Sequence, residues 1–180
     1  MALLAEEIVE EWLNRQGYFT IRGIKLGVHE IDLLAVRFTS GGCECRHIEV
    51  QASIRPVSYL TKLPKDVVKS TGRAAGSAKV RLDTELEAGI REWIHKKYDH
   101  PVKKKARLKL APGPWSRELV VHEVKFPVEL EIIAKLGVTV RKLADVLEEL
   151  KCTDMLLSGA AGAHLVDLIA LTAASIKGGT

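Results

Sequence analysis

The eight residues HEIDLLAV, at positions 29–36, constrain the fold of this chain more than any other segment. Their apolar content is typical of a strand buried in a sheet, yet Asp32 lies in the middle of it. A second apolar segment, HIEVQA at 47–52, contains Glu49 and Gln51. Because side chains alternate along a strand, these two point to the same face. Any function proposed for the chain has to account for these polar side chains on two core strands.

The remaining sequence pattern predicts helices around a mixed sheet. Apolar residues recur at helical spacing over 2–16, and Gly17 is a natural helix end. The expected elements that follow are a hairpin at 18–26 and 29–38, a strand at 45–52 after a turn, a helical segment with Pro64 near its first turn, a helix from about Thr84 to before Asp99, strands at 102–110 and 118–126, helices at 128–136 and 141–151, and a last helix from 155. This order predicts an α/β fold, with a central mixed β-sheet flanked by helices and a C-terminal helical extension.

The length of the chain favours one domain. At 180 residues it is long enough for one sizeable core and too short for two ordinary domains. We expect residues 1–150 to form this domain and a helix within 151–180 to pack on it. The apolar segment 155–176 approaches the length of a bilayer span, but His164 and Asp167 at its centre would cost a few kcal/mol there. A buried amphipathic helix is the better interpretation, so no membrane association is expected.

Cysteine content and the first residues favour the cytoplasm. Cys43, Cys45 and Cys152 are too few and too scattered for a secreted disulfide framework or a four-ligand zinc site. The chain begins MALLAEEIVEEWL, where a signal peptide would have a basic start and an uninterrupted apolar run. No export signal is visible, and a reducing cytoplasmic location is expected.

Basic residues gather in the middle third of the chain. Residues 51–110 hold 15 Lys and Arg against 6 Asp and Glu, which marks this third as a candidate surface for a polyanion. The segment VKKKARLKL, at 102–110, alternates as a strand with one basic face would. The candidate nucleic-acid-binding residues on that face are Lys103, Lys105, Arg107 and Lys109. Lysines that protect an exposed edge strand against aggregation are the alternative explanation.

The polar residues of the two core strands suit a metal site. Carboxylates on neighbouring strands, with a third on a helix packed against them, offer the hard oxygen ligands that Mg²⁺ or Mn²⁺ prefers. Asp32 and Glu49 are the strand carboxylates, and Glu6, which borders the apolar stripe of the first helix, is the candidate third. Phosphodiester hydrolysis uses such a site, because the metal activates a bound water and offsets charge on the leaving oxygen.

Three segments, read together, resemble the PD-(D/E)XK nuclease superfamily. They are AEEIVEEWLNRQGY, HEIDLLA and HIEVQ, and the likeness covers roughly residues 5–60. The pattern is similar to archaeal-type Holliday-junction resolvases and to a small bacterial family of predicted nucleases, whose motifs include GEIDLIA and VEVK. Both relatives place a Glu eleven residues before the Gly that ends the first helix, as Glu6 precedes Gly17. The resemblance implies a restriction-endonuclease-like core.

The same resemblance implies a metal-dependent DNA endonuclease. Asp32 and Glu49 would bind Mg²⁺ (or Mn²⁺), and Glu6 would bind it directly or through water. Gln51 occupies the position of the catalytic lysine. An amide can orient the attacking water by hydrogen bonds, whereas a lysine ammonium also stabilises the transition-state phosphate. A homodimer is implied as well, because archaeal-type resolvases act as two-fold dimers.

Two other functions stay open on the sequence. The first is a non-catalytic nucleic-acid-binding module that keeps the nuclease fold, which Gln51 favours. The second is a plain interaction protein whose carboxylates pair with internal cations such as Arg22 or Arg46. This last alternative predicts that divalent metal leaves the stability of the protein unchanged, whereas a metal site would raise the melting temperature.

Overall fold

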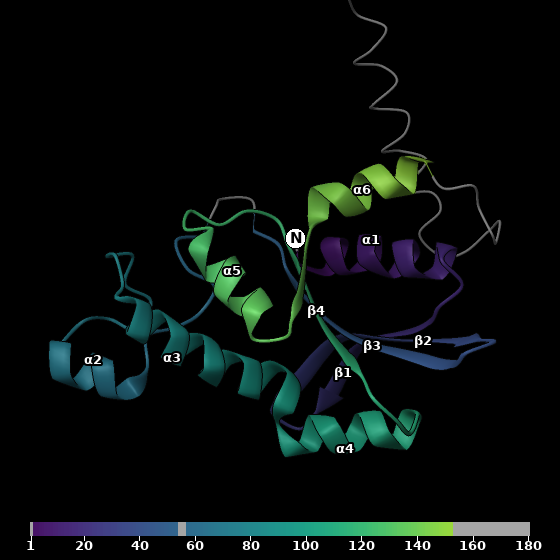
Figure 1. The fold of residues 1–180 in the computed structure, drawn as a ribbon, viewed down its shortest axis with the longest axis horizontal. Coiled ribbons are helices and arrows are strands. Elements are labelled where there is room, and N and C mark those ends of the chain that lie inside the picture. The colour runs from purple at the N-terminus through teal and green to yellow at the C-terminus, as the bar shows by residue number, and fades with distance from the viewer. Residues whose placement is uncertain (1, 54–56, 153–180) are drawn as a thin grey trace, which may run out of the picture.

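The protein is an α/β fold built on one five-stranded mixed sheet (Figure 1). The computed structural model describes residues 2–53 and 57–152. The strands are β1 (Phe19–Leu26), β2 (His29–Thr39), β3 (Gly42–Gln51), β4 (Ser116–Val121) and β5 (Thr139–Lys142). The helices are α1 (Ala2–Arg15), α2 (Lys65–Thr71), α3 (Asp83–Ile94), the π-helical turn η1 (His95–Asp99), α4 (Pro101–Leu110), α5 (Val128–Lys135) and α6 (Leu143–Cys152).

The order of strands across the sheet is the same as their order along the chain. Strands β1, β2 and β3 form an antiparallel meander, and β3, β4 and β5 run parallel. Parallel neighbours need a crossover connection. Helices α2, α3, η1 and α4 lie in the crossover from β3 to β4, and α5 lies in the crossover from β4 to β5.

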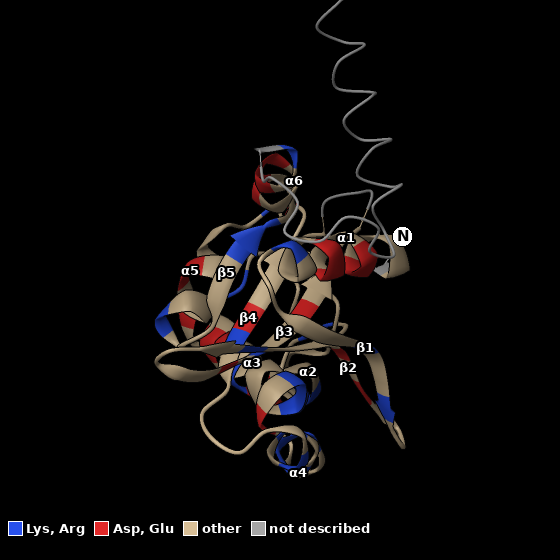
Figure 2. Cartoon of the chain, turned by 90° about the vertical axis from the view of Figure 1, so that its right-hand side faces the viewer, with Lys and Arg blue, Asp and Glu red and all other residues tan. Residues whose placement is uncertain are grey.

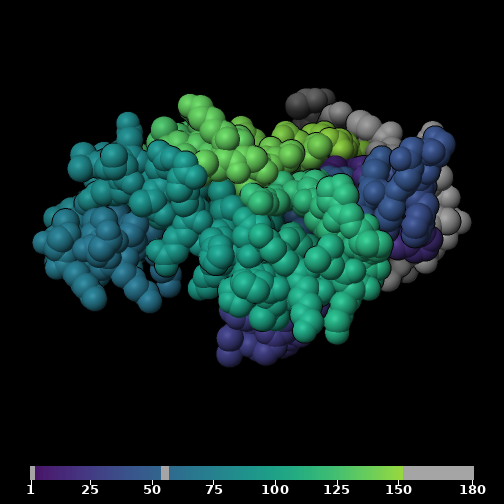
Figure 3. All heavy atoms as spheres, turned by 60° about the horizontal axis from the view of Figure 1, so that its bottom comes forward, coloured from purple at the N-terminus to yellow at the C-terminus, as the bar shows by residue number. Residues whose placement is uncertain are grey.

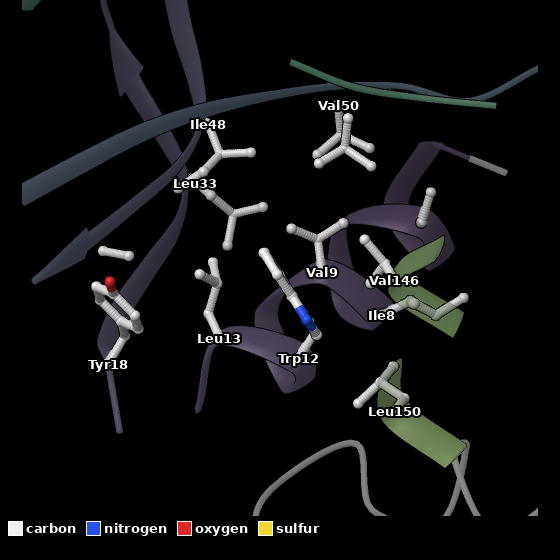
Figure 4. Packing of buried hydrophobic residues seen from close by; sticks show 13 residues of the cluster. Ile8, Val9, Trp12, Leu13, Tyr18, Leu33, Ile48, Val50, Val146 and Leu150 are labelled. Carbon is white, nitrogen blue, oxygen red and sulfur yellow. The ribbon is translucent and has the colours of Figure 1, made fainter. Parts of the chain in front are cut away.

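Helices α1 and α6 lie side by side on one face of the sheet (Figures 1 and 2). Their apolar stripes meet alternate side chains of β2 and β3 in a closed cluster around Val9, Trp12 and Leu13 (Figure 4). The indole N–H of Trp12 donates to the Glu149 carboxylate at 2.6 Å, so the polar atom of the ring is satisfied at the rim of this cluster. The helix predicted over residues 2–16 is confirmed as α1.

Helices α3, η1 and α5 cover the opposite face with a second apolar cluster. Its largest member, Tyr98 of η1, is fully buried, and its hydroxyl donates to the Glu118 carbonyl oxygen at 2.6 Å. Asp32, His47 and Glu49 belong to this face, because Leu33 and Ile48, their neighbours along the strands, pack in the first cluster. The candidate polar residues therefore face α3, η1 and α4.

The prediction of a strand at 102–110 is wrong, because these residues form helix α4. Pro101 stands at its first turn, where a missing N–H costs nothing. Lys103 and Arg107 lie one turn apart on its buried side, while Leu108 is 58% exposed. The alternation of basic and apolar residues suggested a strand, but the buried side of this segment is the basic one.

The expected C-terminal helix, with the apolar segment 155–176, lies outside the described residues. Among residues 2–53 and 57–152, none of the helices combines the length and the apolar character that a membrane span requires. The other expected helices and strands are present, with β5 as an additional strand at Thr139–Lys142. The mixed sheet with flanking helices that the sequence predicts is confirmed at this level.

Candidate active site

Asp32 lies where strands β2 and β3 part. The last ladder pair between them is Leu33 with Ile48, so Asp32 faces Glu49 one step further along. The Asp32 Oδ2 atom accepts a hydrogen bond from the Val50 backbone N–H at 2.8 Å. The carboxylate thus takes the place of a backbone acceptor at the opening of the ladder, which explains how an aspartate is accommodated in this strand.

Glu49 is fully buried and is bound by three donors. Its Oε1 atom accepts from His47 Nε2 and from Lys103 Nζ, both at 3.0 Å, and its Oε2 atom accepts from Lys97 Nζ. A buried carboxylate stays charged when it is paired and hydrogen-bonded, as this one is. The sequence predicted Glu49 as a site residue but gave no indication of these partners.

The two buried cations of α4, Lys103 and Arg107, link the site to η1. Lys103 Nζ also donates to the Lys97 carbonyl oxygen at 2.8 Å, and Arg107 donates to the Tyr98 carbonyl oxygen at 2.9 Å. They therefore satisfy carbonyls at the end of the π-helical turn. Arg107 also lies 2.9 Å from His47 Nδ1. Because Arg only donates, that nitrogen accepts, and the His47 proton is on Nε2, where it donates to Glu49.

The strand carboxylates differ in their proton affinity. Burial, and then the charge of Glu49, raise the pKa of Asp32 to about 7. Burial also acts to raise the pKa of Glu49, but the His47 hydrogen bond and the ammonium groups of Lys97 and Lys103 outweigh it and lower that pKa to about 2. Two adjacent carboxyl groups with separated pKa values are typical of sites that bind cations or transfer protons.

Lys97 binds Glu49 and interacts with Asp32 through its charge. Burial alone would lower the pKa of Lys97, but Glu49 and Asp32 together raise it. The residue comes from η1, a single π-helical turn of the kind often found at functional sites. The sequence did not reveal Lys97, because no spacing rule links position 97 to the strands. Its one signal was a basic pair, Lys96 and Lys97, that interrupts an apolar helical pattern.

Gln51 and Glu6 border this group without joining its hydrogen bonds. The Gln51 side chain is half-buried and, within the described residues, makes no hydrogen bond. Burial raises the pKa of Glu6, Arg22 lowers it, and the charges of Glu30 and Glu49 raise it further, so Glu6 lies within electrostatic range of the site. In the part of the chain that the structure describes, no three or more His, Cys, Asp or Glu side chains are grouped closely enough to hold a metal ion.

The partners suggested for a plain interaction protein lie elsewhere. Arg22 binds Glu10 at 2.9 Å, and Arg46 binds Glu118, so neither pairs with Asp32 or Glu49. The internal cations that do pair with Glu49 are lysines of η1 and α4.

The four basic residues predicted to bind nucleic acid divide into two pairs. Lys103 and Arg107 are buried in the site, which rules out a role for them on an exposed basic face. Lys105 and Lys109 are exposed on α4. Figure 2 shows Lys and Arg on α2 and α4 and Asp and Glu on α1, so the charge asymmetry along the sequence is also an asymmetry in space.

Comparison with known proteins leaves the family of this chain open. No protein-family model matches the chain, and no curated protein matches it. A solved structure described as "Crystal Structure of Protein of Unknown Function AF1548" aligns over 100% of both chains, at 12% sequence identity and a TM-score of 0.48. That description names no function, and a likeness of this size assigns neither fold family nor activity.

Proposed function

We propose that this chain is a metal-dependent DNA endonuclease with a restriction-endonuclease-like core. The observation that carries the proposal is the position of Lys97. Its ammonium binds Glu49 and lies in the field of Asp32, so the positive charge that Gln51 does not provide is supplied from η1. Asp32, Glu49 and Lys97 together are the residue types that phosphodiester hydrolysis requires.

Asp32 and Glu49 would hold the Mg²⁺ or Mn²⁺ ion. Two carboxylates fit this group, because Mg²⁺ keeps several waters and is usually bound through one or two carboxylates and substrate phosphates. The desolvated Asp32, with its pKa near 7, favours a divalent cation beside it. When bound, the metal activates a water and neutralises charge on the phosphate. Glu6 would contribute through its charge, which interacts with that of Glu49.

The protein's own groups then act on the phosphate and the water. The Lys97 Nζ donates to a non-bridging phosphate oxygen and stabilises the charge that develops there in the transition state. Glu49 and the Lys103 contact with the Lys97 carbonyl oxygen fix that ammonium in place. The Gln51 amide orients the attacking water by a hydrogen bond. Water attacks the phosphorus in line as the P–O bond to the leaving ester oxygen breaks, and the proton lost by the attacking water is balanced by one that the leaving oxygen takes up from solvent.

DNA is the proposed substrate, held by exposed lysines. Lys105 and Lys109 on α4 remain the candidates for phosphate contacts, which position a strand without reading its sequence. These two lysine contacts therefore add no sequence preference of their own.

A second copy of the chain is the other proposed partner. Phe19 and Phe38, each 74% exposed, and Leu110 line a 470 Å³ apolar hollow beside β1. Strand β1 is an edge of the sheet in the part that the structure describes. An apolar hollow beside an unpaired strand suits a symmetric contact between two copies.

The first test is cleavage of labelled linear duplex, single-stranded, nicked and four-way-junction DNA with Mg²⁺ or Mn²⁺. Cutting that is lost in Asp32→Ala and in Glu49→Ala supports the proposal, and the preferred substrate narrows the role. If every substrate stays intact while binding survives in both variants, the endonuclease proposal is rejected.

A non-catalytic nucleic-acid-binding module is the second candidate. The observation that favours it is that Glu49 is already neutralised by Lys97 and Lys103. A buried carboxylate paired in this way is also consistent with a structural role. Under this alternative, added Mg²⁺ leaves the melting temperature unchanged, whereas the endonuclease site predicts a rise.

A further inference from the structure

A second, smaller cavity adjoins the proposed cleavage site. It has a volume of 260 Å³ and lies between the end of β3, the segment around residues 60–62 and the C-terminal half of α3. Its lining residues are Gln51, Leu60, Lys62, Trp93, Lys96 and Lys97, together with Gly89 and Glu92. Lys97 and Gln51 belong to both the cavity and the proposed site, so the two are continuous.

The wall of the cavity is held rigidly. Glu129, a fully buried carboxylate of α5, accepts from the Leu60 and Thr61 backbone N–H groups at 2.7 and 2.9 Å and from the Thr61 hydroxyl at 2.6 Å. Gly89 lets α3 approach this segment, because a Cβ there would lie 2.7 Å from the Lys62 carbonyl oxygen. A glycine inside a helix costs stability, and the close approach of segment 60–62 to α3 explains why one stands at this position. Figure 3 shows the blue-to-teal part of the chain that contains α2 and α3 at one end of the molecule.

Four polar side chains of the cavity are free to bind a ligand. Among the described residues, the side chains of Gln51, Lys62, Glu92 and Lys96 take part in no hydrogen bond or ion pair with the protein. The neighbouring Lys103, by contrast, binds Glu49 and the Lys97 carbonyl oxygen. A rigid cavity with unengaged donors and acceptors is suited to an external molecule.

Trp93 gives the cavity an aromatic surface. Its ring is half-buried, with Tyr98 edge-on behind it at 5.8 Å between ring centroids. Its indole N–H makes no hydrogen bond within the part of the chain that the structure describes. A planar ligand can stack on such a ring, and the ammonium groups of Lys62 and Lys96 at the rim suit a phosphate. A nucleobase with its phosphate combines both features.

We propose that this cavity binds one unstacked nucleotide of a DNA strand, with its base against Trp93 and its flanking phosphate on Lys62 and Lys96. The inference rests on the proposed function, because Lys97 would place this nucleotide next to the scissile phosphate. The Glu92 carboxylate accepts a hydrogen bond from an exocyclic amino group, which cytosine has and thymine lacks. The cavity therefore favours an amino-bearing base and selects where a strand is cut.

The test is binding without cleavage, using the whole chain and labelled single-stranded oligo-dC and oligo-dT in EDTA, followed by fluorescence anisotropy. Trp93→Leu is expected to weaken oligo-dC binding about 5- to 150-fold, the loss that one stacked base accounts for, while Trp93→Phe keeps most of the affinity. Trp115→Leu, at another half-buried tryptophan, is the matched control and is expected to bind normally. Glu92→Gln should abolish the preference for oligo-dC over oligo-dT, and Lys62→Met should lower the slope of affinity against salt by about 0.7, the value for one phosphate contact on a single strand.

The outcomes separate this inference from the endonuclease proposal. Trp93→Leu with wild-type affinity, or an equal loss in Trp115→Leu, overturns the nucleotide cavity even if the wild type cuts DNA. A loss confined to Trp93→Leu, with unchanged melting temperature, supports the cavity even if nothing is cut. Free dCMP that displaces oligo-dC at equal concentration overturns the assignment to a strand and makes this a mononucleotide site.

Discussion

Replacing Asp32 with Asn is expected to stabilise the protein above neutral pH. The carboxylate lies in a desolvated position beside Glu49, which raises the pKa of Asp32 from 3.8 to about 7. Asn keeps the acceptor that binds the Val50 N–H at 2.8 Å, so the substitution removes the charge and retains the geometry. Active-site carboxyl groups in such positions commonly reduce stability in exchange for function.

The size of this effect follows from proton linkage. A raised folded-state pKa means that Asp32 contributes stability below pH 3.8, and that this contribution is lost as pH rises to about 7. Each pH unit in that window changes the free energy of unfolding by about 1.4 kcal/mol, so the full loss is roughly 4 kcal/mol. Contact of the partly buried side chain with water makes this an upper value. Asp32→Asn does not titrate and escapes the loss.

The assay is urea denaturation of the wild type and Asp32→Asn between pH 4 and pH 9, with the exposed Glu123→Gln as the control. The two stabilities should nearly coincide at pH 4, diverge up to pH 7 and stay apart above it. Added Mg²⁺ should narrow the gap at pH 8, because it stabilises the charged carboxylate alone. A gap that does not change with pH, or a variant less stable than the wild type at pH 8, would refute this account of Asp32.

Four further substitutions test the site and its surroundings. Glu49→Gln removes the counter-charge of the buried Lys103 and one of the two carboxylates that act on the half-buried Lys97, and should lower the free energy of unfolding by about 3–5 kcal/mol in chemical denaturation. Gly89→Ala should destabilise by about 1–3 kcal/mol in the same assay despite the better helix propensity of Ala, because the new Cβ would meet the Lys62 carbonyl oxygen at 2.7 Å. Lys105→Met and Lys109→Met should each lower the salt-dependence slope of duplex binding by about one.

Each of these has a control and a contrary result. Glu87→Gln breaks the exposed pair with Arg91 and should change stability by less than about 1 kcal/mol; an equal loss in both glutamate variants would contradict the buried-cluster account. A stabilising Gly89→Ala would mean that the segment 60–62 does not contact α3. Lys135→Met, on exposed α5 surface, should bind duplex like the wild type.

The sheet and most of the helices could be predicted because their residues follow one period each. The apolar spacing of α1 and the strand composition of β2 and β3 are local signals that the fold obeys. The prediction for segment 102–110 failed because its sequence fits both the period of a strand and the period of a helix. Which side is buried depends on Glu49 and His47, which are more than fifty residues away. A local pattern cannot report partners at that distance.

The candidate site divides in the same way. Asp32 and Glu49 were detectable because a carboxylate in an apolar strand conflicts with its surroundings, and that conflict is visible in the sequence itself. Lys97 and the cavity around Trp93 were not, because their relation to β3 arises from the packing of η1 and α3 on the sheet. Trp93 lies at helical spacing within α3 and is half-buried, so one part of its ring packs in the second apolar cluster and another lines the cavity.

The most direct test of the account is single-turnover DNA cleavage by Lys97→Met, with Lys135→Met as the charge-matched control. If the ammonium of Lys97 stabilises the transition-state phosphate, Lys97→Met should cut roughly 100-fold more slowly or worse, with DNA affinity changed far less, and Lys135→Met should cut at the wild-type rate. Equal cleavage rates in all three proteins would contradict the central claim.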